Sequence, residues 1–126
     1  MPQVRDFMVS DVVTTTSSAG IVEAANTMIQ QKKGPLPVLD GQRVVGMITD
    51  RDIIARAVAA GQDPNSMKVS DIMTADLVTV SPDADVSEAR QQMAQAQLDR
   101  LLVMEGDQLA GIISEADIRS DEGPLA

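Results

Sequence analysis

An internal duplication constrains the fold more than any other feature, because it spans nearly all of the 126 residues. The segment from Val4 to Met8 (VRDFM) returns 65 residues later as VSDIM, and GMITDRD, which ends at Asp52, returns as GIISEAD, which ends at Asp117. About a third of the positions from 4 to 54 are identical in the second copy without a gap, far above what two unrelated segments share. The chain therefore consists of two copies of one structural unit.

Each copy has the pattern of a strand, a helix, two strands and a second helix. Helical spacing of apolar residues from Ile21 to Ile29 predicts the first helix, and its counterpart is predicted to start at a D-x-x-E cap of Asp85 and Glu88. The predicted strands are 12–15, 36–39 and 44–48, then 77–80, 101–104 and 109–113. The second helices are predicted at 50–60, ending at a glycine, and in a shorter form from residue 115.

The expected fold is therefore α/β (α+β), with two tandem β-α-β-β-α repeats forming one module. We place the first repeat at 4–60, a linker at 61–68, the second repeat at 69–120 and a flexible tail at 121–126. A repeat of this size cannot close a core alone, so the copies are expected to pack with pseudo-twofold symmetry and to leave two equivalent clefts between them.

Composition excludes several classes of function. Ten basic residues against nineteen acidic ones give a net charge of −9, which disfavours nucleic acid as a partner. The chain has no His and no Cys, so it lacks the usual metal ligands and nucleophile–base pairs, and we expect no metal and no catalytic residues. No segment approaches 18 apolar residues, so we expect no membrane contact and a cytoplasmic protein.

The repeated motifs resemble those of the cystathionine-β-synthase (CBS) domain, and the duplication resembles its paired form, the Bateman module. The resemblance rests on the V-x-D-h-M openings, the h-x-h-P-V-h-D-like strands and G-h-h-[ST]-x-x-D, seen twice in the same order. It implies a non-catalytic regulatory module that binds AMP, ADP, ATP or S-adenosylmethionine and needs no further cofactor. It also implies that Asp52 and Asp117 bind ribose hydroxyls, while Thr49 and Ser114 contact phosphate.

Physical chemistry allows these roles and also offers a simpler one. The start of a helix presents unpaired N–H groups and a positive dipole end, which suit a phosphate, and a carboxylate can accept hydrogen bonds from two vicinal hydroxyls. However, Thr49-x-x-Asp52 and Ser114-x-x-Asp117 are also ordinary capping boxes with Asp in place of Glu. The two roles do not exclude each other.

Two arginines are candidates for phosphate contact. Family geometry implies a phosphate-binding residue just before the first hairpin strand, where Arg100 stands and where the first copy has Pro35. Arg51 lies in the motif itself, with Ala116 as its counterpart, so the two clefts are expected to be unequal. The resemblance implies that Arg100 reaches the cleft whose ribose residue is Asp52, whereas the simpler alternative is a surface pair with a neighbouring aspartate, Asp50 or Asp99.

The remaining expectations concern the adenine, the assembly and rival functions. Apolar and hydroxyl residues of the short strands are candidates for an adenine slot: Val13, Thr14, Val38, Ile48, Val78, Thr79, Val103 and Ile113.

We expect a homodimer through the second helices, with Ile53, Ile54, Ala57, Val58 and Ile118 buried against a second chain. The rival functions are a ligand-free interaction module and, less favoured, an Asp-dependent nucleotide hydrolase. The sequence leaves open which adenosine compound binds, which clefts it fills, how the dimer is oriented and which protein is regulated.

Overall fold

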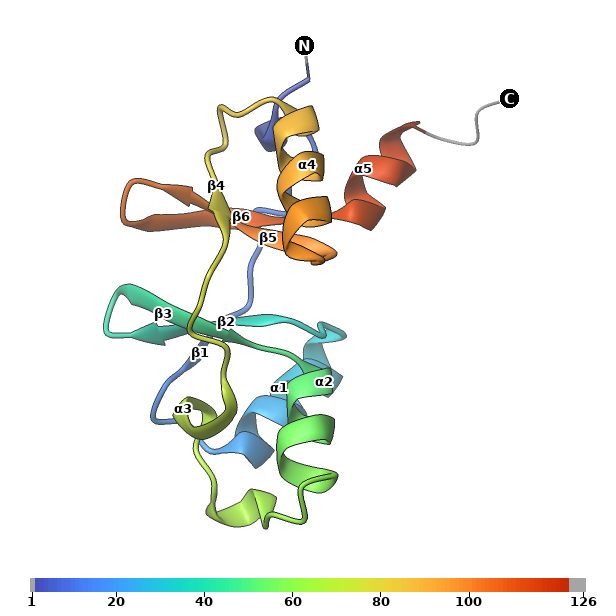
Figure 1. The fold of residues 1–126 in the computed structure, drawn as a ribbon. Helices are drawn as coiled ribbons and strands as arrows, with labels where there is room; N and C mark the ends of the chain where they lie inside the picture. The colour runs from blue at the N-terminus through green and yellow to red at the C-terminus, as the bar shows by residue number, and fades with distance from the viewer. Residues whose placement is uncertain (1, 123–126) are drawn as a thin grey trace. The chain divides into compact units, whose positions relative to one another are not determined.

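The chain folds into two compact units, which a computed structural model describes over residues 2–122 (Figure 1). Residues 13–77 form one, called here the central unit, and residues 1–12 together with 78–126 form the other, called the terminal unit. Each contains a three-stranded sheet, and Figure 1 shows the longer helices of each unit on one face of its own sheet.

The central unit has the predicted order of elements. Strand β1 (Thr15–Thr16) runs parallel to β2 (Leu36–Asp40), and β2 runs antiparallel to β3 (Arg43–Ile48), with β2 in the middle of the sheet. The β2–β3 turn places Gly41 at φ +65°, a backbone conformation that favours glycine. The helical elements are α1 (Ile21–Gln31), α2 (Asp50–Ile53), the π-helical turn η2 (Ile54–Val58), the 3-10 turn η3 (Pro64–Ser66) and α3 (Val69–Ile72).

The terminal unit repeats this topology. Its sheet contains β4 (Thr79–Val80), β5 (Arg100–Glu105) and β6 (Gln108–Ser114), with the same parallel and antiparallel pairings. Its helical elements are the 3-10 turn η1 (Val4–Asp6), α4 (Val86–Ala96) and α5 (Glu115–Glu122). Helix α5 includes the first two residues of the predicted tail, and residues 123–126 of that tail lie outside the described residues.

The opening segment of each sequence copy packs on the remainder of the other copy. Val4 is buried in the core of the terminal unit. Val9 lies along β6 and exchanges two backbone hydrogen bonds, of 2.8 and 3.0 Å, with Ile112 of that strand. In the central unit, Val69 is buried in the core. Thr74 lies along β3 and exchanges two backbone hydrogen bonds, of 2.8 and 2.9 Å, with Met47 of that strand. The compact units therefore differ from the sequence repeats at 4–60 and 69–120.

A glycine lies at each of these crossing points. A Cβ atom on Gly111 would lie 2.6 Å from the carbonyl oxygen of Val9, and one on Gly46 would lie 2.9 Å from that of Thr74. Real Cβ atoms do not approach a backbone oxygen so closely, so only glycine lets the opening segment lie against the sheet. The close packing of the opening segment against the sheet thus explains why each G-h-h-[ST]-x-x-D motif begins with glycine.

The aspartate of each V-x-D-h-M opening also has a structural role. Asp6 accepts a hydrogen bond of 2.9 Å from the backbone N–H of Gln3, and Asp71 accepts one of 2.8 Å from that of Lys68. Each carboxylate caps the short helical turn that precedes the crossing segment. The repeated motif therefore encodes the exchange of segments between copies.

Helix α4 is capped by Asp85, although not in the predicted way. Its carboxylate accepts from the backbone N–H of Ser87 at 3.0 Å and from the Ser87 hydroxyl at 3.0 Å, so the cap does not use Glu88. The hydrogen bond from the Ser87 amide, followed by that from its hydroxyl, holds the pKa of Asp85 below its ordinary value. The carboxylate therefore stays charged and keeps capping the helix further into the acid range.

Both cores are aliphatic. The central core includes Ile21, Leu36 and Ile48, and the terminal core includes Leu101, Ile113 and Ile118, each at most 1% exposed. Within residues 2–122, no helix is long and apolar enough to cross a bilayer.

Candidate functional site

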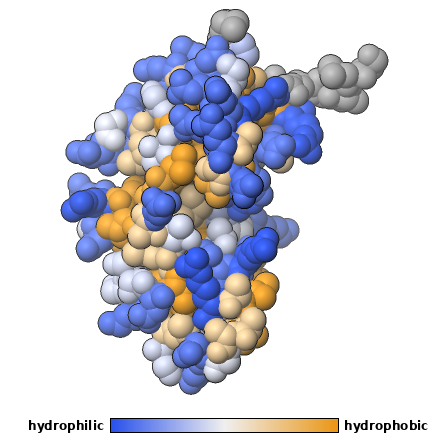
Figure 2. All heavy atoms as spheres, in the orientation of Figure 1, coloured by the Kyte–Doolittle hydropathy of each residue, from blue (hydrophilic) through white to orange (hydrophobic). Residues whose placement is uncertain are grey.

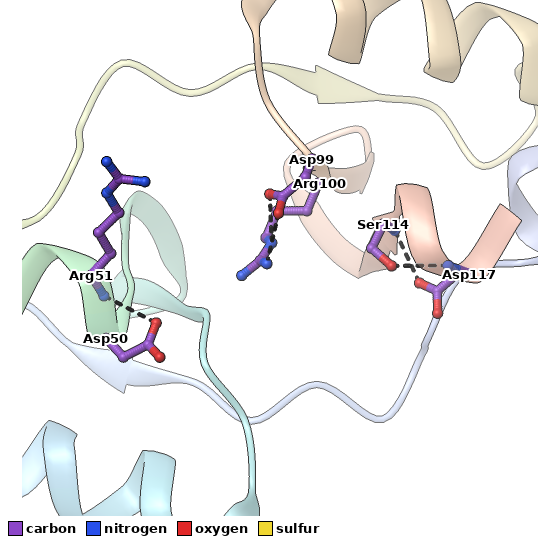
Figure 3. Close-up of polar contacts among 6 residues, drawn as sticks. All are labelled: Asp50, Arg51, Asp99, Arg100, Ser114 and Asp117. Atoms are coloured by element: carbon purple, nitrogen blue, oxygen red, sulfur yellow. Dashed lines mark hydrogen bonds and ion pairs between the residues drawn. The ribbon is translucent and has the colours of Figure 1, made fainter. Parts of the chain in front are cut away.

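The two Thr/Ser–Asp pairs occupy matching positions, each where the last strand of a unit passes into its second helix. Thr49 is the N-cap of α2, and Ser114 is the last residue of β6, directly before α5. The backbone N–H of Thr49 donates to Oδ2 of Asp52 at 2.9 Å, and the Asp52 N–H donates to the Thr49 hydroxyl at 3.1 Å. Ser114 and Asp117 form the same two bonds at 3.0 and 3.1 Å (Figure 3). Both pairs are therefore complete capping boxes.

Each box leaves part of its polar chemistry uncommitted. The capping bonds use Oδ2 of each aspartate, and among residues 2–122 nothing donates a hydrogen bond to Oδ1 of Asp52 or Asp117. The hydroxyls of Thr49 and Ser114 accept from an amide and retain their own proton for donation. Both aspartates are partly exposed, so a ligand hydroxyl can approach the free oxygen while the cap stays intact.

The two candidate arginines differ in how their charges are compensated. Arg100 pairs with its neighbour Asp99 through two contacts, Nε to Oδ1 at 3.1 Å and a terminal nitrogen to Oδ2 at 3.2 Å. The Arg51 side chain extends away from the Asp50 carboxylate, which instead accepts from the Arg51 backbone N–H at 3.0 Å (Figure 3). In the described part of the chain, no group bonds the Arg51 guanidinium. The surface pairing considered for Arg100 is thus present.

The strand register places Arg100 beside one of the boxes. Arg100 on β5 is directly opposite Ser114 on β6, so it belongs to the terminal unit, as does Asp117. Asp52 belongs to the central unit. The expectation that Arg100 serves the site of Asp52 stays a prediction.

Four of the residues expected to line an adenine slot are core residues instead. Val38 and Ile48 in the central unit, and Val103 and Ile113 in the terminal unit, are all 0% exposed. Their side chains are enclosed by the two cores, so that part of the prediction is wrong. The other four candidates remain accessible: Val13 and Val78 are half-buried, and Thr14 and Thr79 are exposed.

The second helices also differ from the expected dimer surface. Ala57 and Ile118 are 0% and 1% exposed, and Ile53 packs against the central core. Ala57 and Ile118 are therefore not available to a second chain, whereas Ile53 is only half-buried. Ile54 and Val58 remain exposed, at 60% and 62%.

A hollow of about 370 Å³ lies between α4 and α5 and was not predicted from the sequence. Its lining residues are Arg90, Met93, Ala94, Leu98, Glu115 and Arg119. Ser114 and Asp117 of the capping box are not among them. Arg119 bonds Glu115 at 2.6 Å across one turn of α5. The signal available in the sequence was divergence between the copies, because the counterparts of Arg90 and Arg119 are Ala25 and Ile54.

The described residues contain no cluster of three or more His, Cys, Asp or Glu side chains that could hold a metal ion. The aspartates of the two capping boxes accept hydrogen bonds from the backbone N–H groups of Thr49 and Ser114. Nothing in residues 2–122 groups them with further carboxylates for metal-assisted chemistry.

Comparison with known proteins agrees with the duplication. The family model for the CBS domain matches twice, at residues 4–59 and 69–121. The chain is 37% identical over 118 residues to the CBS domain-containing protein YhcV of Bacillus subtilis, covering 94% of this chain and 84% of that protein.

Two solved structures have the same fold. The CBS domain pair of protein MJ0100, in complex with 5′-methylthioadenosine and S-adenosyl-L-methionine, superposes with a TM-score of 0.86 at 28% identity, covering 98% of this chain and 97% of that one. A hexameric CBS-CP12 protein from bloom-forming cyanobacteria gives a TM-score of 0.87 at 33% identity, covering 98% of this chain and 72% of that one. The chain is therefore a member of the CBS domain family and consists of a tandem pair of CBS domains.

Proposed function

We propose that this protein is a non-catalytic regulatory module that binds an adenosine compound through the two Thr/Ser–Asp boxes. The observation that carries the proposal is the uncommitted Oδ1 of Asp52 and of Asp117, each held in place by a completed cap. The complex of MJ0100 with two adenosine compounds supports the choice of ligand class. Binding would be sensed by a partner protein.

The cap positions the carboxylate for ribose. Oδ2 is anchored by the backbone N–H of Thr49 or Ser114, so the side chain holds one orientation before the ligand arrives. An oxygen with two lone pairs can accept from both vicinal hydroxyls of ribose. Because little side-chain entropy remains to be lost, the arrangement favours binding. The hydroxyl proton of Thr49 or Ser114 can then be donated to a phosphate oxygen.

Phosphate recognition is expected to depend on the Asp99–Arg100 pair. If Arg100 serves a phosphate, Arg100→Ala weakens AMP binding and leaves adenosine binding nearly unchanged, because adenosine has no phosphate. Asp99→Asn removes the competing carboxylate and should strengthen AMP binding instead. Calorimetric titration of both variants with AMP and adenosine, repeated at high salt, measures this. Equal effects of Arg100→Ala on the two ligands would show that Arg100 only packs the site.

The two boxes are expected to have unequal affinities for AMP. Arg100 has no basic counterpart at Pro35, and Arg51 has none at Ala116, so the cationic groups available differ between the sites. Two affinity classes should appear in the wild-type titration, and Arg100→Ala should affect the tighter one. One class with two identical sites would contradict this expectation.

Thermal unfolding with added nucleotide separates ligand binding from the alternative of a ligand-free interaction module. That alternative is favoured by the completed capping boxes, which give Asp52 and Asp117 a structural role without any ligand. A ligand at 100 times its Kd adds about 2.7 kcal/mol to the free energy of unfolding. We expect a raised Tm with at least one adenosine compound. An unchanged Tm with every adenosine compound would favour the interaction module.

A further inference from the structure

The hollow between α4 and α5 has an apolar floor. Met93, Ala94 and Leu98 supply it from α4 and the turn that follows this helix. Met93 is 3% exposed and belongs to the core beneath, whereas Leu98 is 43% exposed and offers apolar surface to whatever enters the hollow. Figure 2 shows mostly hydrophilic residues over the visible faces of α4 and α5. The hollow therefore holds apolar surface within polar surroundings.

Charged side chains complete the lining. Arg90 on α4 and Arg119 on α5 both line the hollow, and both residues are exposed. Arg119 bonds Glu115 at 2.6 Å through one terminal nitrogen. A guanidinium has five N–H donors, so Arg119 can also donate to a ligand. Two guanidinium groups against one carboxylate leave a local excess of positive charge.

This excess is unusual for the terminal unit. The unit carries four Lys and Arg against twelve Asp and Glu, a formal charge of −8. Two of its four basic residues line the hollow, whereas Arg5 pairs with Asp83 and Arg100 pairs with Asp99. An anion that approaches this unit is therefore attracted to the hollow more than to the rest of its surface.

The duplication shows which residues distinguish the hollow from its counterpart. Three lining positions differ between the copies: Arg90, Ala94 and Arg119 stand where the central unit has Ala25, Ile29 and Ile54. Alanine has three fewer side-chain carbons than isoleucine, so the terminal copy has space where Ile29 extends from α1. It has a cationic group at the other two positions. One copy has therefore acquired both room and positive charge at the same place.

We propose that the α4–α5 hollow binds a small amphipathic carboxylate, such as the anion of a medium-chain fatty acid. Its hydrocarbon part covers the apolar floor, and its carboxylate accepts hydrogen bonds from Arg90 and Arg119. The planar fork of donors on a guanidinium matches the two oxygens of a carboxylate. The volume of about 370 Å³ lies at the lower end of the range for small-molecule sites. Ser114 and Asp117 do not line the hollow, so this inference is independent of adenosine binding.

Other small ligands fit the lining less well. A nucleotide base would find no aromatic, hydroxyl or amide side chain among the six lining residues. A cation would be repelled by the two guanidinium groups, and inorganic phosphate would leave the apolar floor in contact with water. An anion with a hydrocarbon part satisfies both halves of the lining.

Methyl NMR titration of the whole chain with octanoate tests the proposal. Chemical-shift changes are expected at Met93, Ala94 and Leu98. Met28 and Ile29 occupy equivalent positions of the central unit and serve as internal references. We expect a Kd of about 0.1–1 mM, as is usual for so small a ligand at an exposed site. Butyrate should bind at least about tenfold more weakly, because each buried methylene is worth about fourfold in affinity. Octylammonium, with the opposite charge, should not bind.

Matched variants locate the site. Ala94→Ile installs the residue of the other copy, fills the hollow and should raise the Kd for octanoate at least about tenfold. Arg119→Gln removes one guanidinium and should raise the Kd at least about threefold, with a smaller loss at high salt. Ile29→Ala makes the equivalent space in the central unit, where no arginine lines it, and should leave the Kd within about twofold. Thermal unfolding checks that all three variants fold.

Four results would overturn the proposal. They are the absence of saturable shifts at tens of millimolar octanoate, equal binding of octylammonium, normal binding by Ala94→Ile, and shifts at Met28 as large as those at Met93, which would mark an adventitious additive only. The titration is repeated at two protein concentrations. An affinity that falls as the protein concentration rises would mean that a second copy covers the hollow, and that result would also exclude the proposed ligand site.

Discussion

Replacing Gly111 by alanine is expected to lower the free energy of unfolding by about 1–3 kcal/mol, the usual cost of an overpacked core site. The added Cβ would lie 2.6 Å from the carbonyl oxygen of Val9, a backbone atom that cannot move without breaking its hydrogen bond to the Ile112 N–H. The opening segment would have to separate from β6. Gly46→Ala should act in the same direction, because its Cβ would lie 2.9 Å from the carbonyl oxygen of Thr74.

Gly20→Ala is the control for this prediction. Gly20 is the N-cap of α1 with φ −74°, and its added Cβ would meet nothing closer than 4.0 Å, so the expected loss of stability is limited to the poorer capping by alanine and should be smaller than that of Gly111→Ala. Urea unfolding of the three variants measures the difference. Stability of Gly111→Ala equal to that of Gly20→Ala would show that the opening segment does not lie against β6 in solution.

Replacing both Asp52 and Asp117 by alanine is expected to weaken the binding of an adenosine compound strongly at both sites. Each substitution removes a charge-assisted acceptor and should cost about 1.5–3 kcal/mol in its own site, a loss of roughly 10- to 150-fold in affinity. Each also removes a helix cap, which costs about 1 kcal/mol of stability. The double variant should therefore remain folded at 25 °C while binding its ligand roughly 10- to 150-fold more weakly at each site.

Asparagine separates the cap from the ligand contact. In Asp52→Asn and Asp117→Asn the amide oxygen can still accept from the Thr49 or Ser114 N–H, so the helix cap is kept and the negative charge is lost. We expect near wild-type unfolding and weakened binding, measured by calorimetry. A double alanine variant that binds AMP normally would refute the site assignment.

The duplication made the topology predictable, but not the division of the chain into units. The strands and first helices occur close to the predicted positions because apolar periodicity and the Asp40-Gly41 turn are local signals. The exchange of opening segments is not local. Val4 and Val69 align with each other in sequence, yet each is buried against the opposite copy, and similarity between copies carries no information about contact.

The capping boxes were predictable from the sequence, but the burial of the apolar site candidates was not. Spacing alone predicted the box of Thr49 and Asp52, whereas their role toward a ligand came from the family resemblance and stays a prediction. Val38 and Val103 were assigned to a ligand slot although an apolar strand residue can equally face a core, and in a middle strand it does so here. Burial of a side chain depends on what packs over the strand, and the strand's own sequence does not encode that.

Calorimetric titration of the wild-type protein with adenosine, AMP, ATP and S-adenosylmethionine is the most direct test of the proposed function. We predict saturable binding of at least one adenosine compound, with no more than two sites per chain, and binding that is at least about tenfold weaker in the Asp52→Ala, Asp117→Ala double variant. Absence of binding by every adenosine compound at millimolar concentration, or equal binding by the double variant, would contradict it.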